Sequence, residues 1–226
     1  MKEIIKIADE NNNILNDRAE EIDIRKENAL MREIILELKD TLRNHKEGVG
    51  LAAPQIGYNK RIFVINFSGD LRSFINPIIS EVKGFELSKE GCLSIPGKEF
   101  IRPRNNEITV LYQTPLGKIE SRKLVGKAAI IFQHEIDHLD GLLISDIGFE
   151  IDENYEKATE DEKAQIIQKY MDSLDIKKKA VEDEIQNDPE LKKQDDAIKF
   201  MEALQQGQVQ FEKATNDIKE DDKKGE

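Results

Sequence analysis

The residues that shape turns are concentrated in the first two thirds of this 226-residue chain. Eleven of the 13 glycines, five of the six prolines and all nine arginines lie within residues 1–150. Because tight turns depend on glycine and proline, only this part can form a fold of many short elements. Residues 151–226 carry 22 acidic and 13 basic side chains, and so hold nine of the chain's twelve net negative charges. We place a domain boundary near residues 148–158, between a domain over 1–150 and an acidic, mostly helical extension over 151–226.

Composition excludes several classes of protein. The chain contains no run of about 18 apolar residues, so we expect no membrane-spanning helix. Its start carries acids where a signal peptide needs an apolar run, and its single cysteine cannot form an internal disulfide. A net charge of −12 argues against binding to DNA. The sequence therefore predicts a cytoplasmic protein that binds neither DNA nor a membrane.

Apolar periodicity divides the first domain into helices and strands. Between Ile24 and Leu42, apolar residues recur every three or four positions, which predicts an amphipathic helix. β-rich runs over 61–66, 73–76 and 107–112 are bounded by turn residues and predict strands. The apolar run 128–132 leads directly into a polar stretch, and we interpret both as one buried helix. The expected fold class is α+β, with strands placed before a central helix.

The acidic extension has the pattern of helices. Thr159 and Glu162 have the spacing of a capping box, and a second helix is expected to begin at Asp188-Pro189. The first of these helices carries an apolar stripe at helical period, formed by Ile166, Ile167, Tyr170, Met171 and Leu174. The charge run over 217–226 cannot bury a core, so we predict that the last ten or so residues are disordered.

The strongest chemical signal is the motif His-Glu-Ile-Asp-His at residues 134–138, which holds two of the chain's three histidines. Positions four apart share one face of a helix, so both imidazoles can reach a single metal ion. Glu135 would point about 100° away, where it can act on a metal-activated water rather than bind the metal. The same pattern arises by chance on surface helices, but the apolar run before it favours a buried position. The third histidine, His45, is interpreted as a surface residue.

A catalytic metal site usually has three protein ligands and an open position, so His134 and His138 need a third partner. An acid further along the chain could provide it, since no histidine follows His138. The other candidate is Cys92, whose turn-rich surroundings between Gly84 and Gly97 predict an exposed loop. Cys92 could also be a small buried apolar residue, or a nucleophile activated by a histidine. A thiolate ligand would make the site softer than that of an ordinary peptidase.

A third cluster, Gly48 to Gly57, reads Gly-Val-Gly-Leu-Ala-Ala-Pro-Gln-Ile-Gly. Its glycines would let the backbone approach a ligand closely. The spacing fits neither a dinucleotide-binding loop nor a phosphate-binding loop. Gln55 would supply an uncharged donor, which suits a carbonyl oxygen that becomes an oxyanion.

In this order and at these separations, the segments Gly48 to Gln55, Glu90 to Ser94 and Gln133 to Gly141 resemble the three signature motifs of the peptide deformylase family. The resemblance covers residues 1–150 and implies antiparallel β-sheets around a central metal-binding helix, followed here by the helical extension. It implies that a divalent metal ion is held by Cys92, His134 and His138. Fe²⁺ would be the working metal in the cell, with Zn²⁺ or Ni²⁺ as substitutes.

Family membership would also define the reaction, which removes the formyl group from the N-terminal formyl-methionine of newly made polypeptides. A metal-bound hydroxide would attack the formyl carbon, and Glu135 would act as general base and then as general acid. The oxyanion donors would be the Gln55 side chain and the Leu93 backbone N–H. The resemblance also implies that the backbone of Gly50 contacts the substrate. Val49, Ile130 and Ile131 could line a methionine pocket, or could belong to the core instead. Gln133 and Asp137 would orient the histidines.

Two departures from the family pattern affect partners. Many bacterial members have an arginine that holds the substrate backbone, and Glu99 stands at that place ahead of Pro103-Arg104. A basic C-terminal helix tethers some members to the ribosome, whereas this chain has an acidic extension that rRNA would repel. We therefore do not extend ribosome association to this chain, and nascent formylated polypeptides remain the expected partner.

Two other functions are consistent with parts of the pattern. Another metal-dependent amidase or peptidase could share the His-Glu-x-x-His helix, and would tolerate replacement of Cys92 by Ala. Alternatively, the protein could have no enzymatic activity, with its function carried by the extension and a first domain that has lost catalysis. The intact set of Gln55, Cys92, His134, Glu135 and His138 argues against such a loss.

Overall fold

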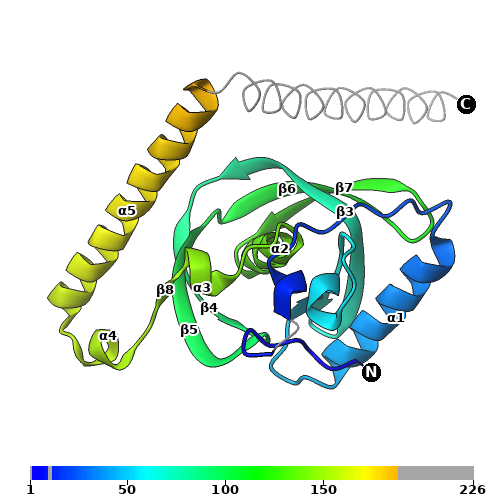
Figure 1. Cartoon of the computed structure of the whole chain (residues 1–226), viewed down its shortest axis with the longest axis horizontal. Helices are drawn as coiled ribbons and strands as arrows, with labels where there is room; N and C mark the ends of the chain where they lie inside the picture. The colour runs from blue at the N-terminus through cyan, green and yellow to red at the C-terminus, as the bar shows by residue number, and fades with distance from the viewer. Residues whose placement is uncertain (1, 10–11, 188–226) are drawn as a thin grey trace, which may run out of the picture. The chain divides into compact units, whose positions relative to one another are not determined.

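A computed structural model describes residues 2–9 and 12–187, with side chains for residues 2–9 and 13–174 (Figure 1). The chain divides into two compact units, Met1–Lys157 and Ala158–Glu226. The helix expected from Asp188 and the disorder expected over 217–226 lie outside the described residues.

The first unit is an α+β domain with two antiparallel sheets. The larger sheet has the strand order β1-β2-β3-β6-β7 and the smaller one β4-β5-β8. The predicted fold class is thus confirmed. The elements are η1 (Asn12–Leu15), α1 (Asn28–Arg43), β1 (Gly50–Ala52), η2 (Ala53–Ile56), β2 (Ile62–Phe67), β3 (Asp70–Lys83), β4 (Glu86–Cys92), β5 (Ile95–Arg104), β6 (Glu107–Gln113), β7 (Ile119–Val125), α2 (Lys127–Leu139), α3 (Ile144–Ile147), β8 (Phe149–Glu150) and α4 (Glu153–Lys157).

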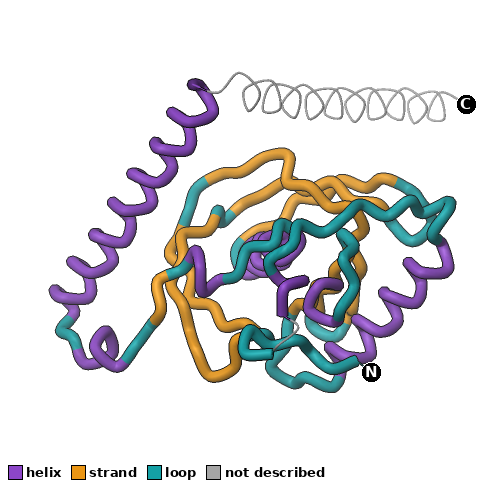
Figure 2. Tube along the Cα trace, viewed as in Figure 1, coloured by secondary structure: helices purple, strands orange, loops and turns teal. Residues whose placement is uncertain are grey.

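Strand β2 shows why the larger sheet is covered on both faces. Ile62 and Val64 pack with the apolar side chains of α1, while Phe63 and Ile65 pack with those of α2. Because alternate residues of a strand point to opposite faces, a strand buried on both sides becomes a continuous apolar run. Figure 2 shows the strands surrounding the central helix, α2.

Aromatic rings fill the space between the larger sheet and α2. The ring of Phe132 meets those of Phe63 and Phe74 edge-on, at centroid distances of 4.9 and 5.2 Å. Such edge-to-face pairs add about 0.5–1.5 kcal/mol each to the free energy of burial. Phe132 lies two residues before His134, so this aromatic cluster anchors the half of α2 that carries the motif.

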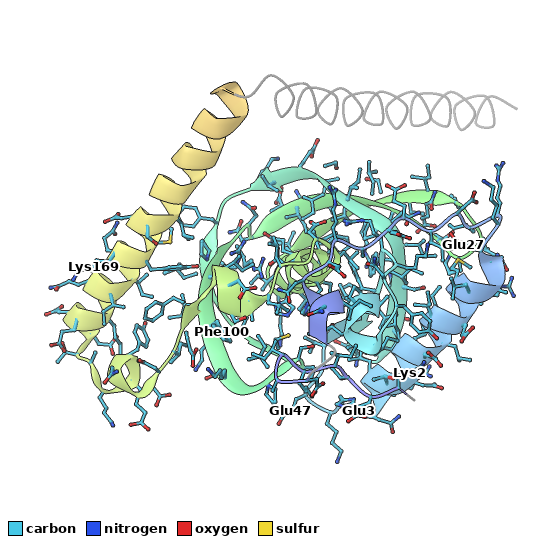
Figure 3. All side chains as sticks on the ribbon, viewed as in Figure 1. Lys2, Glu3, Glu27, Glu47, Phe100 and Lys169 are labelled. Atoms are coloured by element: carbon cyan, nitrogen blue, oxygen red, sulfur yellow. The ribbon has the colours of Figure 1, made fainter. Side chains whose placement is uncertain are left out.

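The stretch between Gly84 and Gly97, expected as an exposed loop, instead forms most of the β4–β5 hairpin. Along β4, Ser88, Glu90 and Cys92 are buried while the residues between them are exposed. The alternation is therefore real, but its inward positions are polar. A search for alternating apolar residues misses such a strand. Beneath the smaller sheet, Phe100, labelled in Figure 3, packs with Cys92 and with neighbouring apolar side chains.

In the second unit, the described residues form one helix, α5 (Glu160–Asn187). The predicted capping box is present, because the Thr159 N–H donates to Glu162 Oε2 at 2.8 Å and the Glu162 N–H donates to Thr159 Oγ1 at 3.4 Å. Among the described residues, no helix is both long and apolar enough to cross a membrane.

Replacement of Phe74 by Ala should lower the free energy of unfolding by about 3–5 kcal/mol, because it leaves a cavity in the aromatic core. Urea denaturation of the variant measures the loss. Leu116→Ala is the control, since Leu116 is 91% exposed and its truncation should cost less than about 0.5 kcal/mol. Equal losses in both variants would contradict the assignment of the core.

Candidate metal centre

Three candidate ligands from two elements meet inside the first unit. Cys92 is the last residue of β4, while His134 and His138 lie one turn apart on α2. One ligand atom from each of the three lies within 4.8 Å of the other two. The Cys92 Sγ is 3.3 Å from His138 Nε2. The residues that the sequence singled out for a metal are therefore brought together.

The position of Cys92 differs from the expected exposed loop. Its side chain is buried, and it opens the tight turn in which Cys92 pairs with Ile95. Within residues 2–9 and 12–187, no acid further along the chain joins the ligand cluster. Of the two candidates for a third ligand, the structure places the cysteine beside the histidines.

The donor set fits a transition metal that prefers nitrogen and sulfur. Burial raises the pKa of the Cys92 thiol, but the nearby charge of His138 and hydrogen bonds with both histidines bring that pKa well below its usual range. The sulfur is thus held as the thiolate that binds metals. One thiolate and two imidazoles give three protein ligands, which leave a fourth, open position at a tetrahedral ion.

Glu90 orients the first of the two histidines. Its Oε2 accepts a hydrogen bond from His134 Nδ1 at 2.8 Å, so His134 Nε2 is the nitrogen left for the metal. Burial raises the pKa of Glu90, yet the hydrogen bonds from His134 and Arg104 outweigh this effect and bring the pKa to about 2. Glu90 is therefore a carboxylate at neutral pH.

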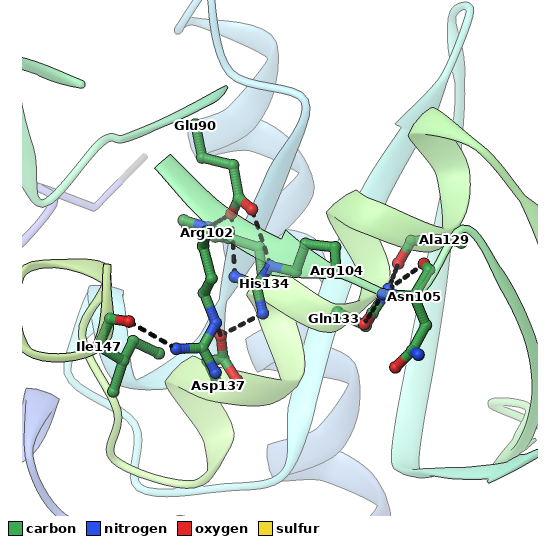
Figure 4. A network of polar contacts seen from close by, with 9 residues as sticks. All are labelled: Glu90, Arg102, Arg104, Asn105, Ala129, Gln133, His134, Asp137 and Ile147. Atoms are coloured by element: carbon green, nitrogen blue, oxygen red, sulfur yellow. Dashed lines mark hydrogen bonds and ion pairs between the residues drawn. The ribbon is translucent and has the colours of Figure 1, made fainter. Parts of the chain in front are cut away.

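Arg104 completes this polar network, which Figure 4 shows at close range. Its Nε and Nη2 donate to the two oxygens of Glu90 at 2.7 and 2.9 Å, and its Nη1 donates to Asp137 Oδ2 at 2.6 Å. Asp137, expected to support a histidine, is thus connected to His134 through Arg104 and Glu90. Gln133 was also expected to support a histidine, but it bonds instead to the backbone of Asn105 and Ala129.

Sequence reasoning missed both Glu90 and Arg104. A signal for Glu90 was present, because Glu90 stands two residues before Cys92 and a strand places such residues on one face. Arg104 could not be found in this way. The register of β4 and β5 pairs Arg104 with Glu86, and only the long Arg104 side chain reaches Glu90, which the sequence did not reveal.

Glu135 lies beside the ligands and is 3% exposed. Burial raises its pKa to about 7, against the opposing charges of His134 and His138. Its Oε2 has no hydrogen-bond partner within the part of the chain that the structure describes. A buried acceptor without a partner is costly, so it marks a place where a ligand or water completes the site.

Gly50, on β1, makes room for this carboxylate. A side chain at this position would overlap the Glu135 carboxylate, with the Glu135 Cδ only 2.8 Å from an added Cβ. The glycines of this cluster were expected to let the backbone approach a ligand. The close approach that Gly50 makes in the structure is to the Glu135 side chain, and its contact with a substrate stays a prediction.

Gln55 in η2 is held with its amide nitrogen towards the ligands. Its Oε1 accepts from the Ala52 N–H at 2.8 Å, while its Nε2 is 3.2 Å from Ser94 Oγ and 3.8 Å from Cys92 Sγ. Leu93 occupies the turn directly after Cys92. Both predicted oxyanion donors thus lie next to a candidate metal ligand.

The three predicted pocket residues are not fully buried. Val49 precedes β1 and is 39% exposed, while Ile130 and Ile131 are partly buried in the first turn of α2. Ile131 also packs against the core cluster around α2. Their role as walls of a methionine pocket stays a prediction.

A buried thiolate and two imidazoles, with a carboxyl group beside them, define the site of a mononuclear metal hydrolase. Comparison with known proteins specifies the class further. The family model for polypeptide deformylase matches residues 1–153, and the chain belongs to that family. A peptide deformylase of Dictyoglomus turgidum is 41% identical over 144 residues, which are 64% of this chain and 90% of that protein.

Solved structures agree with this assignment. The crystal structure of peptide deformylase from Thermotoga maritima matches with a TM-score of 0.59 and 38% identity, over 65% of this chain and 97% of that chain. A peptide deformylase from Synechococcus elongatus, solved in complex with actinonin, matches with a TM-score of 0.59 and 33% identity. That match covers 65% of this chain and 78% of the other.

Replacement of Glu90 by Gln should weaken Zn²⁺ binding by about 10–100-fold, because the amide is a poorer partner for His134 Nδ1 than the carboxylate. Competition with a chromophoric chelator measures the affinity. The control is Glu99→Gln on the adjacent strand, where the exposed Glu99 side chain pairs with Lys89. Unchanged affinity in a folded Glu90→Gln protein would show that Glu90 does not support the metal site.

Proposed function

We propose that this chain removes the formyl group from the N-terminal formyl-methionine of newly made polypeptides, and that residues 1–150 carry the activity. The observation that supports this most directly is the cluster of Cys92, His134 and His138 ligand atoms beside the buried Glu135. Membership of the polypeptide deformylase family supports the same reaction. The proposed substrates are nascent formylated polypeptides in the cytoplasm.

The proposed cofactor is one divalent metal ion bound by Cys92, His134 and His138. A thiolate with two imidazoles accepts Fe²⁺, Zn²⁺ or Ni²⁺, and we propose Fe²⁺ as the working ion with the other two as substitutes. When bound, the ion supplies Lewis acidity, which polarises a carbonyl and lowers the pKa of a coordinated water.

Glu135 would move the proton in this reaction. A carboxyl group with a pKa of about 7 can both accept and return a proton near neutral pH. We propose that Glu135 first takes a proton from the attacking water. It then delivers a proton to the leaving amine nitrogen, so that the amide breaks into formate and a free N-terminus.

Neutral donors would stabilise the charge that develops on the formyl oxygen. Gln55 Nε2 and the Leu93 N–H are the proposed donors, and the hydrogen bonds of the Gln55 side chain with Ala52 and Ser94 support this role for Gln55. The backbone of Gly50 is the proposed contact to the substrate's own backbone. We propose Val49, Ile130 and Ile131 as the apolar walls around the methionine side chain.

A metal-dependent amidase or peptidase of another kind is the alternative. It shares the helix but has no need of Cys92, and the position of the Cys92 Sγ beside His138 favours the deformylase. We propose no tether to the ribosome through the acidic extension, and no binding to DNA or a membrane.

Glu135→Gln should lower turnover of a formyl-Met-Ala peptide by about 10²–10⁴-fold, because the amide cannot relay a proton. The assay is anaerobic, with the protein loaded with Fe²⁺ or Ni²⁺ and its metal content measured. Glu153→Gln is the control, since the Glu153 side chain is 84% exposed and outside the site. Full turnover by a metal-loaded Glu135→Gln protein would exclude the proposed role, and a metal-loaded parent without turnover would exclude the proposed function.

A protein ending at Ala158 should keep kcat/KM within about twofold of the full chain, because the first compact unit ends at Lys157 and contains the whole site. The comparison uses the same peptide, with the metal content of both proteins matched. A large loss of activity in a folded, metal-loaded truncation would show that the extension takes part in catalysis.

A further inference from the structure

A short segment near the N-terminus, residues 4–7, lies across both clusters that hold the proposed oxyanion donors. We call it the N-terminal strap. The Ile5 N–H donates to the Gln55 carbonyl at 2.9 Å, and the Ile7 N–H donates to the Ser94 carbonyl at 3.1 Å. Ile4, 2% exposed, anchors the strap in the core beneath α1.

Between these two backbone bonds, Lys6 reaches a third carbonyl. Its Nζ donates to the Leu93 carbonyl oxygen at 2.6 Å, across 87 positions of sequence. This is a short, charge-assisted hydrogen bond to a partly buried partner. The N–H of Leu93 is the proposed oxyanion donor, and the Lys6 ammonium binds the carbonyl group of this same residue.

The backbone around Lys6 is itself fixed. The Lys6 N–H donates to Asp9 Oδ2 at 2.6 Å, and the Asp9 N–H returns a bond to the Lys6 carbonyl at 3.0 Å. The Asp9 carboxylate is thus engaged with the backbone. Among the residues that the structure describes, Lys6 forms no ion pair, so its positive charge is directed at a carbonyl dipole.

We propose that Lys6 is a positioning residue for the deformylation proposed above, on which this inference rests. Its ammonium fixes the Leu93 carbonyl, and so the peptide plane that joins Leu93 to Ser94. The Leu93 N–H lies in the preceding plane, so this bond limits its direction by restricting rotation of the Leu93 backbone. The ammonium also places a positive charge beside the residue that is the proposed oxyanion donor. Both effects act on the transition state more than on the bound substrate, so they should affect kcat rather than KM.

A purely structural anchor would behave differently. In that case, loss of the Lys6 bond would lower the melting temperature or the metal content, while kcat per bound metal would stay constant. A substrate-binding role would change KM. The split between kcat and KM, together with rescue by another cation, therefore separates a positioning role from both.

The test compares Lys6→Met, Lys6→Gln and Lys6→Arg in the full chain, with Lys2→Met as the matched control. Lys2, labelled in Figure 3, precedes the strap by two residues, and its Nζ pairs with Glu37 Oε2 at 3.8 Å rather than with Leu93. Turnover of formyl-Met-Ala is measured per bound Ni²⁺. The backbone amide of Leu93 is followed by ¹H–¹⁵N NMR in the Zn²⁺-loaded proteins.

We expect Lys6→Met to lower kcat about tenfold with KM within about twofold, a fraction of the loss that follows removal of an oxyanion donor. Lys6→Arg should recover most of the rate, and Lys6→Gln should recover less. The NMR signal of the Leu93 amide should shift in Lys6→Met but not in the control Lys2→Met. The inference is overturned if kcat per metal is unchanged in Lys6→Met, if only KM changes, or if Lys6→Arg is as slow as Lys6→Met. An inactive, metal-loaded parent would overturn the proposed function itself, whereas an active parent with an unaffected Lys6→Met overturns only the role of Lys6.

Discussion

The ion pairs of Arg104 hold the smaller sheet against α2, and the geometry of the metal centre depends on them. The side chains of Arg104 and Glu90 are 3% and 6% exposed, a position in which an unpaired charge would cost several kcal/mol. Each charge is matched here, because Arg104 binds both oxygens of Glu90 and one of Asp137. Since Glu90 also accepts from His134, the carboxylate that neutralises the arginine is the one that orients a candidate metal ligand.

Lack of space is the second constraint on the site. The backbone of β1 passes so close to α2 that a side chain at position 50 would displace the Glu135 carboxylate. That carboxylate is buried, and burial raises the pKa of the group. The glycine-rich motif and the His-Glu-x-x-His motif are therefore two halves of one packing contact.

The elements that could be predicted from the sequence are those whose buried face is apolar. The helix α1 and the strand β2 follow this rule, and α2 was predicted from its apolar first half, although its second half buries Gln133, Glu135 and His138. Each of the three elements was expected within a few residues of its observed bounds. The hairpin β4–β5 was not expected, because its inward residues Glu90 and Arg104 are charged and only their mutual pairing makes burial possible. Such pairing depends on register between strands, which a single sequence does not contain.

The turn after β4 combines functions that the sequence presents as separate. Cys92 supplies the candidate thiolate ligand, Leu93 the proposed oxyanion N–H, and Ser94 the hydroxyl that lies 3.2 Å from Gln55 Nε2. Because these are three consecutive residues of one tight turn, a change in the conformation of any of them shifts the other two. The N-terminal strap bonds to the carbonyls of the last two, so it holds this turn from a segment outside both sheets and α2. The candidate metal ligands on the helix are held by packing and by Glu90, whereas the residues that carry the proposed oxyanion donors accept hydrogen bonds from a segment at the other end of the domain's sequence.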